Sequence, residues 1–196
     1  MDNLEVLPNT HIGGDGIVSG EFLRIGIDEF INACRYVHKL PYGYNSDRDD
    51  LLILFKEGMG TCSTKHAVIA TLAEELKLPV VRNVGIYAMT EDIVTGAGKI
   101  LEEFALPYIP MIHCFLSYAG YSVDLTEGNR NGKNRPIDHF LFTETVPPDI
   151  SAKDEYLIYR NVLKGSILLN GDLAGADIRQ ILQARERSLL LLKQAI

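Results

Sequence analysis

Apolar residues in the first eighty positions recur at spacings of three and four, a pattern typical of amphipathic helices. One such stretch covers residues 27–40 and stops at Pro41. A second helix is expected over residues 46–58, because Ser46 can cap free amides and Asp49 places an acid in the first turn.

A third helix is predicted to begin close to Cys62 and to end before Pro79. Its buried stripe consists of Ile69, Leu72, Ala73 and Leu76. Steps of three and four residues back from Ile69 reach His66 and Cys62. The Cys62 thiol is therefore expected to face inward.

The middle of the chain has the composition of strands. Residues 79–88 are rich in β-branched side chains and predict a strand, and residues 100–104 predict a short helix. Residues 111–118 and 121–126 are separated by Ala119 and Gly120, which predicts an antiparallel hairpin.

The parity of this hairpin brings a histidine and an acid to one face. A two-residue turn puts Tyr118 opposite Tyr121 and, counting outward, Phe115 opposite Asp124. His113 shares a face with Phe115, so His113 and Asp124 occupy diagonal positions roughly 7 to 8 Å apart. A three-residue turn would send the two side chains to opposite faces.

The last third of the chain changes to helix. After a polar loop at 128–136 and a strand expected at 137–143, apolar spacing predicts helices around 157–163 and 173–192. We therefore expect an α+β fold in which residues 1–148 form one domain. Residues 149–196 are expected to form a helical extension packed on that domain.

Composition narrows the class of protein. The chain of 196 residues is 46% hydrophobic and 23% charged, has no apolar run of about 18 residues, and has no basic-then-apolar start typical of a secretory signal. We expect a cytoplasmic protein without a membrane span. The formal net charge of -7 disfavours nucleic acid as a partner.

The cysteines and acids do not suggest a metal site or a disulfide framework. Three widely spaced cysteines without a CxxC pair argue against both, and reduced thiols are expected. Asp47, Asp49 and Asp50 lack the glycine and the distal glutamate of a calcium loop. We predict neither a metal nor a cofactor.

The chemistry centres on Cys62 in the string EGMGTCSTKH. A cysteine at a helix start is stabilised as a thiolate by the unpaired amides, and those amides can also receive an oxyanion. Gly58 and Gly60 would let a substrate approach the backbone. A nearby imidazole could take the thiol proton, and a carboxylate could orient that imidazole.

These residues resemble the transglutaminase-like superfamily. The likeness covers about residues 40–126 and consists of GTC at a helix start, His113 on an apolar strand, and the GYSVDLT string that contains Asp124. The resemblance implies a papain-like core with a nucleophile helix packed on an antiparallel sheet. It also implies that Cys62 is the nucleophile, that His113 is the general base and acid, and that Asp124 orients His113.

The chain departs from the family in two respects. It has no tryptophan, and Phe115 and Tyr121 stand where many relatives have one. The second oxyanion donor is not evident, and Tyr44 or Tyr42, together with the backbone at Gly60, are the candidates.

Each candidate has a structural alternative. Cys62 could be a small buried hydrophobic residue, and Asp124 could cap a strand end. His66, four residues after Cys62 on one helix face, is a rival base, but we expect it to support the site because no carboxylate near it in sequence would orient it. Cys114 is expected to be a core cysteine, and His139 is a minor candidate.

The prediction is a thiol enzyme that transfers an acyl group from a peptide, protein or small amide substrate to water or an amine. The alternative is a non-catalytic transglutaminase-like module that binds a peptide or partner protein. A third hypothesis, that the helical C-terminus docks another chain, rests on the leucine-rich run at 188–196.

Overall fold

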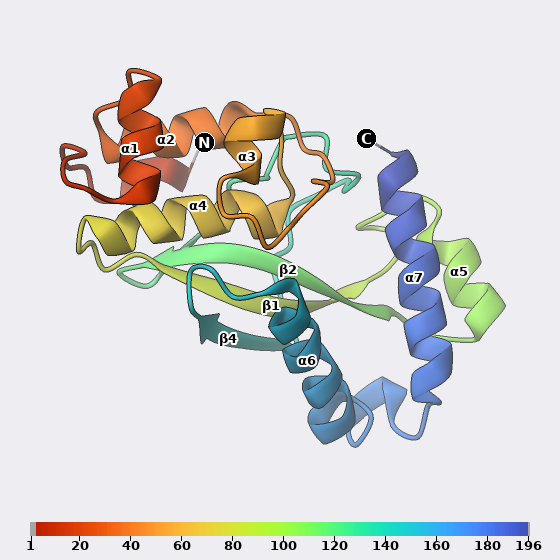
Figure 1. Cartoon of the computed structure of the whole chain (residues 1–196). Helices are drawn as coiled ribbons and strands as arrows, with labels where there is room; N and C mark the ends of the chain where they lie inside the picture. Colours follow the sequence, from red (N-terminus) through yellow and green to blue (C-terminus); the bar gives the residue numbers. More distant parts are fainter. Residues whose placement is uncertain (1–2, 196) are drawn as a thin grey trace. The chain divides into compact units, whose positions relative to one another are not determined.

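The computed structural model describes residues 3–195 and has an α+β fold. Its main elements in chain order are α1 (Ile17–Arg24), α2 (Phe30–Lys39), α3 (Ile53–Glu57), α4 (Cys62–Glu75), β1 (Val81–Met89), α5 (Ala97–Phe104), β2 (Ile109–Tyr118), β3 (Tyr121–Val123), β4 (Phe142–Val146), α6 (Ala152–Val162) and α7 (Ile178–Gln194) (Figure 1). Short helical turns lie at Asn3–Val6, Leu163–Ile167 and Gly171–Leu173.

The four strands form one antiparallel sheet in the order β3-β2-β1-β4. The β2–β3 hairpin has the expected two-residue turn, with Tyr118 paired to Tyr121 and Leu116 to Val123. Ala119 and Gly120 both have positive φ, as tight turns of this kind require. The sequence prediction of the hairpin and its register is confirmed, although β3 ends at Val123, one residue before Asp124.

The chain forms two compact units. Unit 1 contains the described residues up to Val84, together with Cys114–Asn129 and Glu144–Ser151. Unit 2 contains Gly85–His113, Arg130–Thr143 and the described chain from Ala152 onward. The predicted boundary after residue 148 lies close to the last point at which the chain passes from one unit to the other. The chain also passes between the units at four earlier points, three of which lie within β1, β2 and β4.

Each unit has its own hydrophobic core. In unit 1, helices α1, α2 and α3 pack against α4, and the core includes Phe22, Phe30, Leu72 and Leu116. In unit 2, α5 packs against α7, and the core includes Tyr87, Ile109 and Ile181. Three helices thus pack against α4, and Ile69, Leu72 and Ala73 of its predicted stripe are buried, while Leu76 is partly buried.

The helix expected over residues 46–58 is wrong in extent, because α3 covers only Ile53–Glu57. Ser46 does not cap a helix; its hydroxyl donates to Glu57 Oε1 at 2.5 Å. Asp47 accepts the amide of Asp49 at 2.9 Å, so this acid stabilises a turn. Local side-chain bonds of this kind compete with helix formation.

Helix α1 was not predicted from the sequence, because the residue that caps it, Glu75, lies far away in the chain. Gly16 at its N-cap offers no side chain, and Glu75 instead accepts the amides of Val18 at 3.0 Å and Ser19 at 2.7 Å. The strand expected at 137–143 is also displaced, since β4 begins at Phe142. The helical character predicted for the C-terminal third is confirmed by α6 and α7.

Candidate functional site

Cys62 is the first residue of the 14-residue helix α4 and is 9% exposed. The helix start is held by Thr64, whose Oγ1 accepts the amide of Thr61 at 2.9 Å and donates to Asn45 Oδ1 at 2.8 Å. The first-turn amides and the positive end of the helix dipole favour a thiolate at this position. The expected helix start at Cys62 is confirmed.

The segment with the two candidate tyrosines runs beside the residues that lead into α4. Tyr42 forms a parallel bridge with Gly60, and the Gly43 amide donates to Gly60 O at 3.2 Å. The rings of Tyr42 and Tyr44 meet edge to face with centroids 6.1 Å apart. The three residues nominated for oxyanion or substrate contact, Tyr42, Tyr44 and Gly60, thus lie on two adjoining segments.

Tyr44 is electrostatically coupled to Cys62. Burial, with a smaller contribution from the nearby Cys62, raises the pKa of Tyr44 to about 12, and Arg48 acts in the opposite direction. Since the phenol stays protonated at neutral pH, Tyr44 can donate a hydrogen bond. Its hydroxyl is therefore suited to contact a developing negative charge near Cys62.

Backbone conformation and close packing explain the two glycines that precede Cys62. Gly58 ends α3 with a left-handed φ of 65°. A Cβ at Gly60 would lie 2.7 Å from Thr64 Oγ1, so this position requires a residue without a side chain. Close packing on the α4 cap accounts for Gly60 independently of any substrate.

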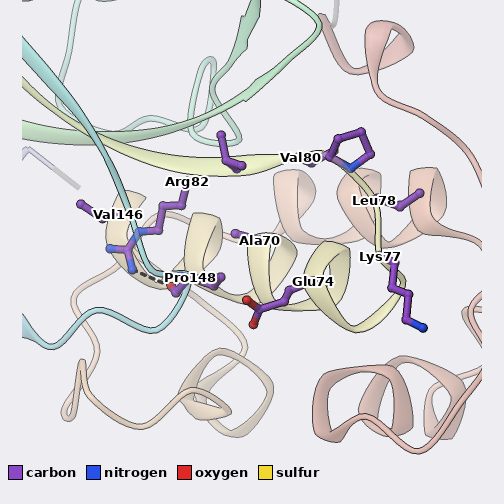
Figure 2. A pocket seen from close by; sticks show the side chains of 10 residues that line it. Ala70, Glu74, Lys77, Leu78, Val80, Arg82, Val146 and Pro148 are labelled. Atoms are coloured by element: carbon purple, nitrogen blue, oxygen red, sulfur yellow. Dashed lines mark hydrogen bonds between the residues drawn. The ribbon is translucent and has the colours of Figure 1, made fainter.

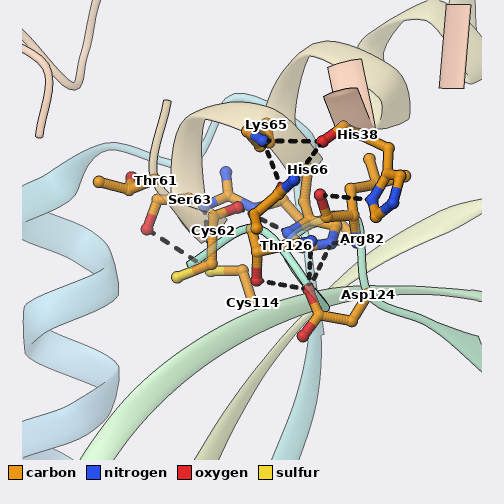
Figure 3. Close-up of polar contacts among 12 residues, drawn as sticks. His38, Thr61, Cys62, Ser63, Lys65, His66, Arg82, Cys114, Asp124 and Thr126 are labelled. Carbon is orange, nitrogen blue, oxygen red and sulfur yellow. Dashed lines mark hydrogen bonds and ion pairs between the residues drawn. The ribbon is translucent and has the colours of Figure 1, made fainter. Parts of the chain in front are cut away.

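A chain of polar contacts links the start of α4 to the sheet (Figure 3). Arg48 Nη2 donates to Ser63 Oγ at 2.7 Å, and Ser63 Oγ lies 3.6 Å from Cys114 Sγ. Arg82 Nη2 donates to Cys114 Sγ at 3.4 Å, while its Nη1 donates to Pro148 O at 2.9 Å. Cys114 is fully buried, which confirms the expectation of a core cysteine.

His66 is fully buried and contacts both Cys62 and the segment around Asp124. Its Nδ1 lies 2.7 Å from Cys62 O, and its Nε2 accepts the Leu125 amide at 2.8 Å. Asp124 Oδ1 lies 3.6 Å from His66 Nε2 and accepts the amide and hydroxyl of Thr126 at 2.8 and 2.7 Å. No carboxylate lies near His66 in sequence, but the fold brings Asp124, 58 residues further on, beside it.

His113 lies on β2 and is the last residue of its segment in unit 2. It is buried, and its ring meets that of Tyr87 edge to face at 6.4 Å. Cys62 and Asp124 both belong to unit 1. The three residues of the predicted triad are therefore divided between the two units, and the base role of His113 stays a prediction.

A second buried group on α4 was missed by the sequence analysis. Lys65 is fully buried, and its Nζ donates to Leu40 O at 2.5 Å, to Asn129 Oδ1 at 2.7 Å and to His38 O at 3.3 Å. Desolvation lowers the pKa of Lys65 to about 8, against an opposing effect of Asp124. Its position three residues after Cys62 on the buried side of the helix was the available signal.

A pocket of about 350 Å³ lies elsewhere on unit 1 (Figure 2). It is bounded by the later turns of α4, the start of β1 and the end of β4, and its lining includes Ala70, Glu74, Val80, Arg82, Val146 and Pro148. Arg82 and Pro148 belong both to this pocket and to the contacts around Cys114.

The remaining candidates lie outside this cluster. Asp50 pairs with Lys56, and within residues 3–195 no group of three or more histidine, cysteine, aspartate or glutamate side chains is placed to hold a metal ion. His139 is exposed. Burial raises the pKa of the Cys34 thiol, so this cysteine is unreactive at neutral pH.

Comparisons of the chain with protein-family models, with curated proteins and with solved structures give no match. No helix in the described part of the chain has both the length and the apolarity needed to cross a membrane. The likeness to the transglutaminase-like superfamily therefore rests on the motif residues alone.

Proposed function

We propose that this protein is a transglutaminase-like thiol enzyme in which Cys62 attacks the carbonyl of an amide or peptide and forms a thioester. The observation that carries the proposal is the placement of Cys62 at the first residue of α4, near the buried Tyr44 whose pKa it helps to raise. A nucleophile and an oxyanion donor are two of the parts that acyl transfer requires on the protein side.

The proposed reaction has two halves. In the first, the Cys62 sulfur bonds to the carbonyl carbon, the carbon–nitrogen bond breaks, and the imidazolium of the base gives its proton to the departing amine. In the second, water or an amine loses a proton to the imidazole and attacks the thioester. The carbon–sulfur bond then breaks, which releases a carboxylic acid or a new amide and restores the thiol.

The roles around the nucleophile follow from chemistry and from the sequence motif. His113 remains the proposed base and Asp124 its proposed orienting acid. His66 is less suited to the base role, because both of its ring nitrogens already have backbone partners. Tyr44 and the first-turn amides of α4 are the proposed oxyanion donors.

The test is site-resolved alkylation of the intact protein. We expect iodoacetamide at pH 7 to modify Cys62 at least about tenfold faster than the buried Cys34, as measured by peptide mass spectrometry, because only the thiolate reacts. Incubation with p-nitrophenyl acetate should then yield an acyl adduct on Cys62 that hydroxylamine removes, and Cys62→Ser should abolish it.

Two results would decide against an enzyme. If Cys62 reacts no faster than Cys34 and Cys114 and titrates near the ordinary thiol pKa of about 8.5, the catalytic proposal fails. If Cys62→Ala leaves a cellular activity of the protein intact, the binding-module alternative replaces it.

A further inference from the structure

The contacts of His66 fix its protonation state. The Leu125 amide can only donate, so Nε2, 2.8 Å away, must accept through its lone pair. The Cys62 carbonyl oxygen can only accept, so Nδ1, 2.7 Å away, must carry the proton. A neutral imidazole protonated at Nδ1 is the single state that satisfies both contacts.

Burial makes this bridge rigid. His66 has no exposed surface, so water cannot replace either partner, and an unsatisfied buried polar group costs about 1 to 3 kcal/mol. One end of the ring is bound to the residue that carries the nucleophile, and the other end is bound to the residue that follows Asp124. The ring therefore sets the spacing between Cys62 and the backbone at Asp124 (Figure 3).

Leu125, whose amide is bound by His66, is also held through its carbonyl oxygen. His38 Nδ1 lies 3.2 Å from Leu125 O, and because a carbonyl oxygen only accepts, this nitrogen of His38 donates. Asp124 is held in turn by the amide and hydroxyl of Thr126. Leu125, and through it the position of Asp124, is therefore held by both imidazoles.

We propose that His66 is a positioning residue for the reaction at Cys62: its Nδ1-protonated ring holds Leu125, and with it Asp124, at a fixed place relative to the nucleophile. This inference rests on the proposed acyl-transfer function. It assigns to His66 a role in geometry and leaves proton transfer to another imidazole.

The first measurement is the tautomer of His66, by nitrogen-15 NMR of the histidine-labelled full chain at pH 7. We expect a ring protonated at Nδ1 and bare at Nε2. A ring protonated at Nε2, or at both nitrogens, overturns the inference whatever the activity of the protein.

The second measurement is the pH dependence of Cys62 alkylation by iodoacetamide in three variants. His66→Leu removes both bonds, and we expect the midpoint of the rate profile to rise by about one pH unit, which lowers the rate at pH 7 about tenfold. His66→Gln keeps an amide oxygen for the Leu125 amide and should recover most of the loss. His11→Gln, which changes an exposed histidine outside these contacts, should leave the midpoint within about 0.3 of the wild-type value.

The outcomes separate the two proposals. A wild-type midpoint at the ordinary thiol value of about 8.5 refutes the proposed function. A wild-type midpoint below that value refutes the positioning role alone if the midpoint is unchanged in His66→Leu. It also does so if the midpoint rises equally in His11→Gln. If His66→Leu does not fold, His66→Gln and the tautomer measurement still decide the question.

Discussion

Lys65 gives the sharpest quantitative prediction, because a buried ammonium group links stability to pH. Its pKa falls from 10.5 to about 8 through desolvation, with Asp124 opposing the change. Between these two values the unfolded chain binds more protons than the folded chain. The free energy of unfolding should therefore gain a contribution that rises with pH from about 8 to 10.5.

The magnitude follows from the two pKa values and the contacts of the ammonium group. The difference between 10.5 and about 8 corresponds to an upper bound of ~3 kcal/mol. Three oxygen acceptors, on Leu40, Asn129 and His38, favour the charged form and reduce the expected gain to about 2 kcal/mol.

The assay is urea unfolding of the wild type and of Lys65→Met at half-unit steps from pH 7 to 10.5. Subtracting the free energy of unfolding of Lys65→Met from that of the wild type cancels the contributions of groups that titrate equally in both proteins. Lys77→Met, which replaces an exposed lysine just beyond the end of the same helix, is the matched control and should give a flat difference. If the difference in the free energy of unfolding between the wild type and Lys65→Met stays constant or falls as the pH rises, the reasoning is refuted.

Two further changes probe the neighbourhood of Cys62. Gly60→Ala places a Cβ 2.7 Å from Thr64 Oγ1, so we expect a loss of about 1 to 3 kcal/mol in urea unfolding, and an unchanged midpoint would contradict the tight packing. Tyr44→Phe should slow acylation of Cys62 by p-nitrophenyl acetate on the order of 100-fold while changing iodoacetamide alkylation less than about twofold, because only acylation develops an oxyanion. Equal losses in both reactions would assign Tyr44 to the thiol and not to the oxyanion.

Local signals predicted the parts of the fold that depend on near neighbours. The β2–β3 hairpin followed from alternation and from Ala119-Gly120, whose turn length sets the register. Helix α4 followed from the spacing of its apolar residues and a start next to Gly60. In both cases the interactions that decide the structure lie within a few residues along the chain.

The features that escaped prediction depend on partners distant in sequence. Helix α1 is capped by Glu75, and the 46–52 segment is held in turns in which Ser46 bonds to Glu57. Asp124 lies beside His66 only because the chain returns to α4 after the hairpin. Spacing along the sequence could nominate Cys62, His66 and Asp124 as candidates, but the contact between His66 and Asp124 was decided by tertiary packing.

The hydrogen bonds from His66 and His38 to Leu125 determine where the chain tolerates insertions and deletions. The hairpin tip at Ala119 and Gly120 is exposed, so added residues can loop out into solvent there. Between Val123 and Leu125 the chain cannot accommodate a change in length, because the Leu125 amide is bound by His66 of α4 and its carbonyl by His38 of α2. A peptide tag or a circular-permutation site therefore belongs at the tip, and a single residue inserted between Val123 and Asp124 would shift the Asp124 carboxylate out of register with α4.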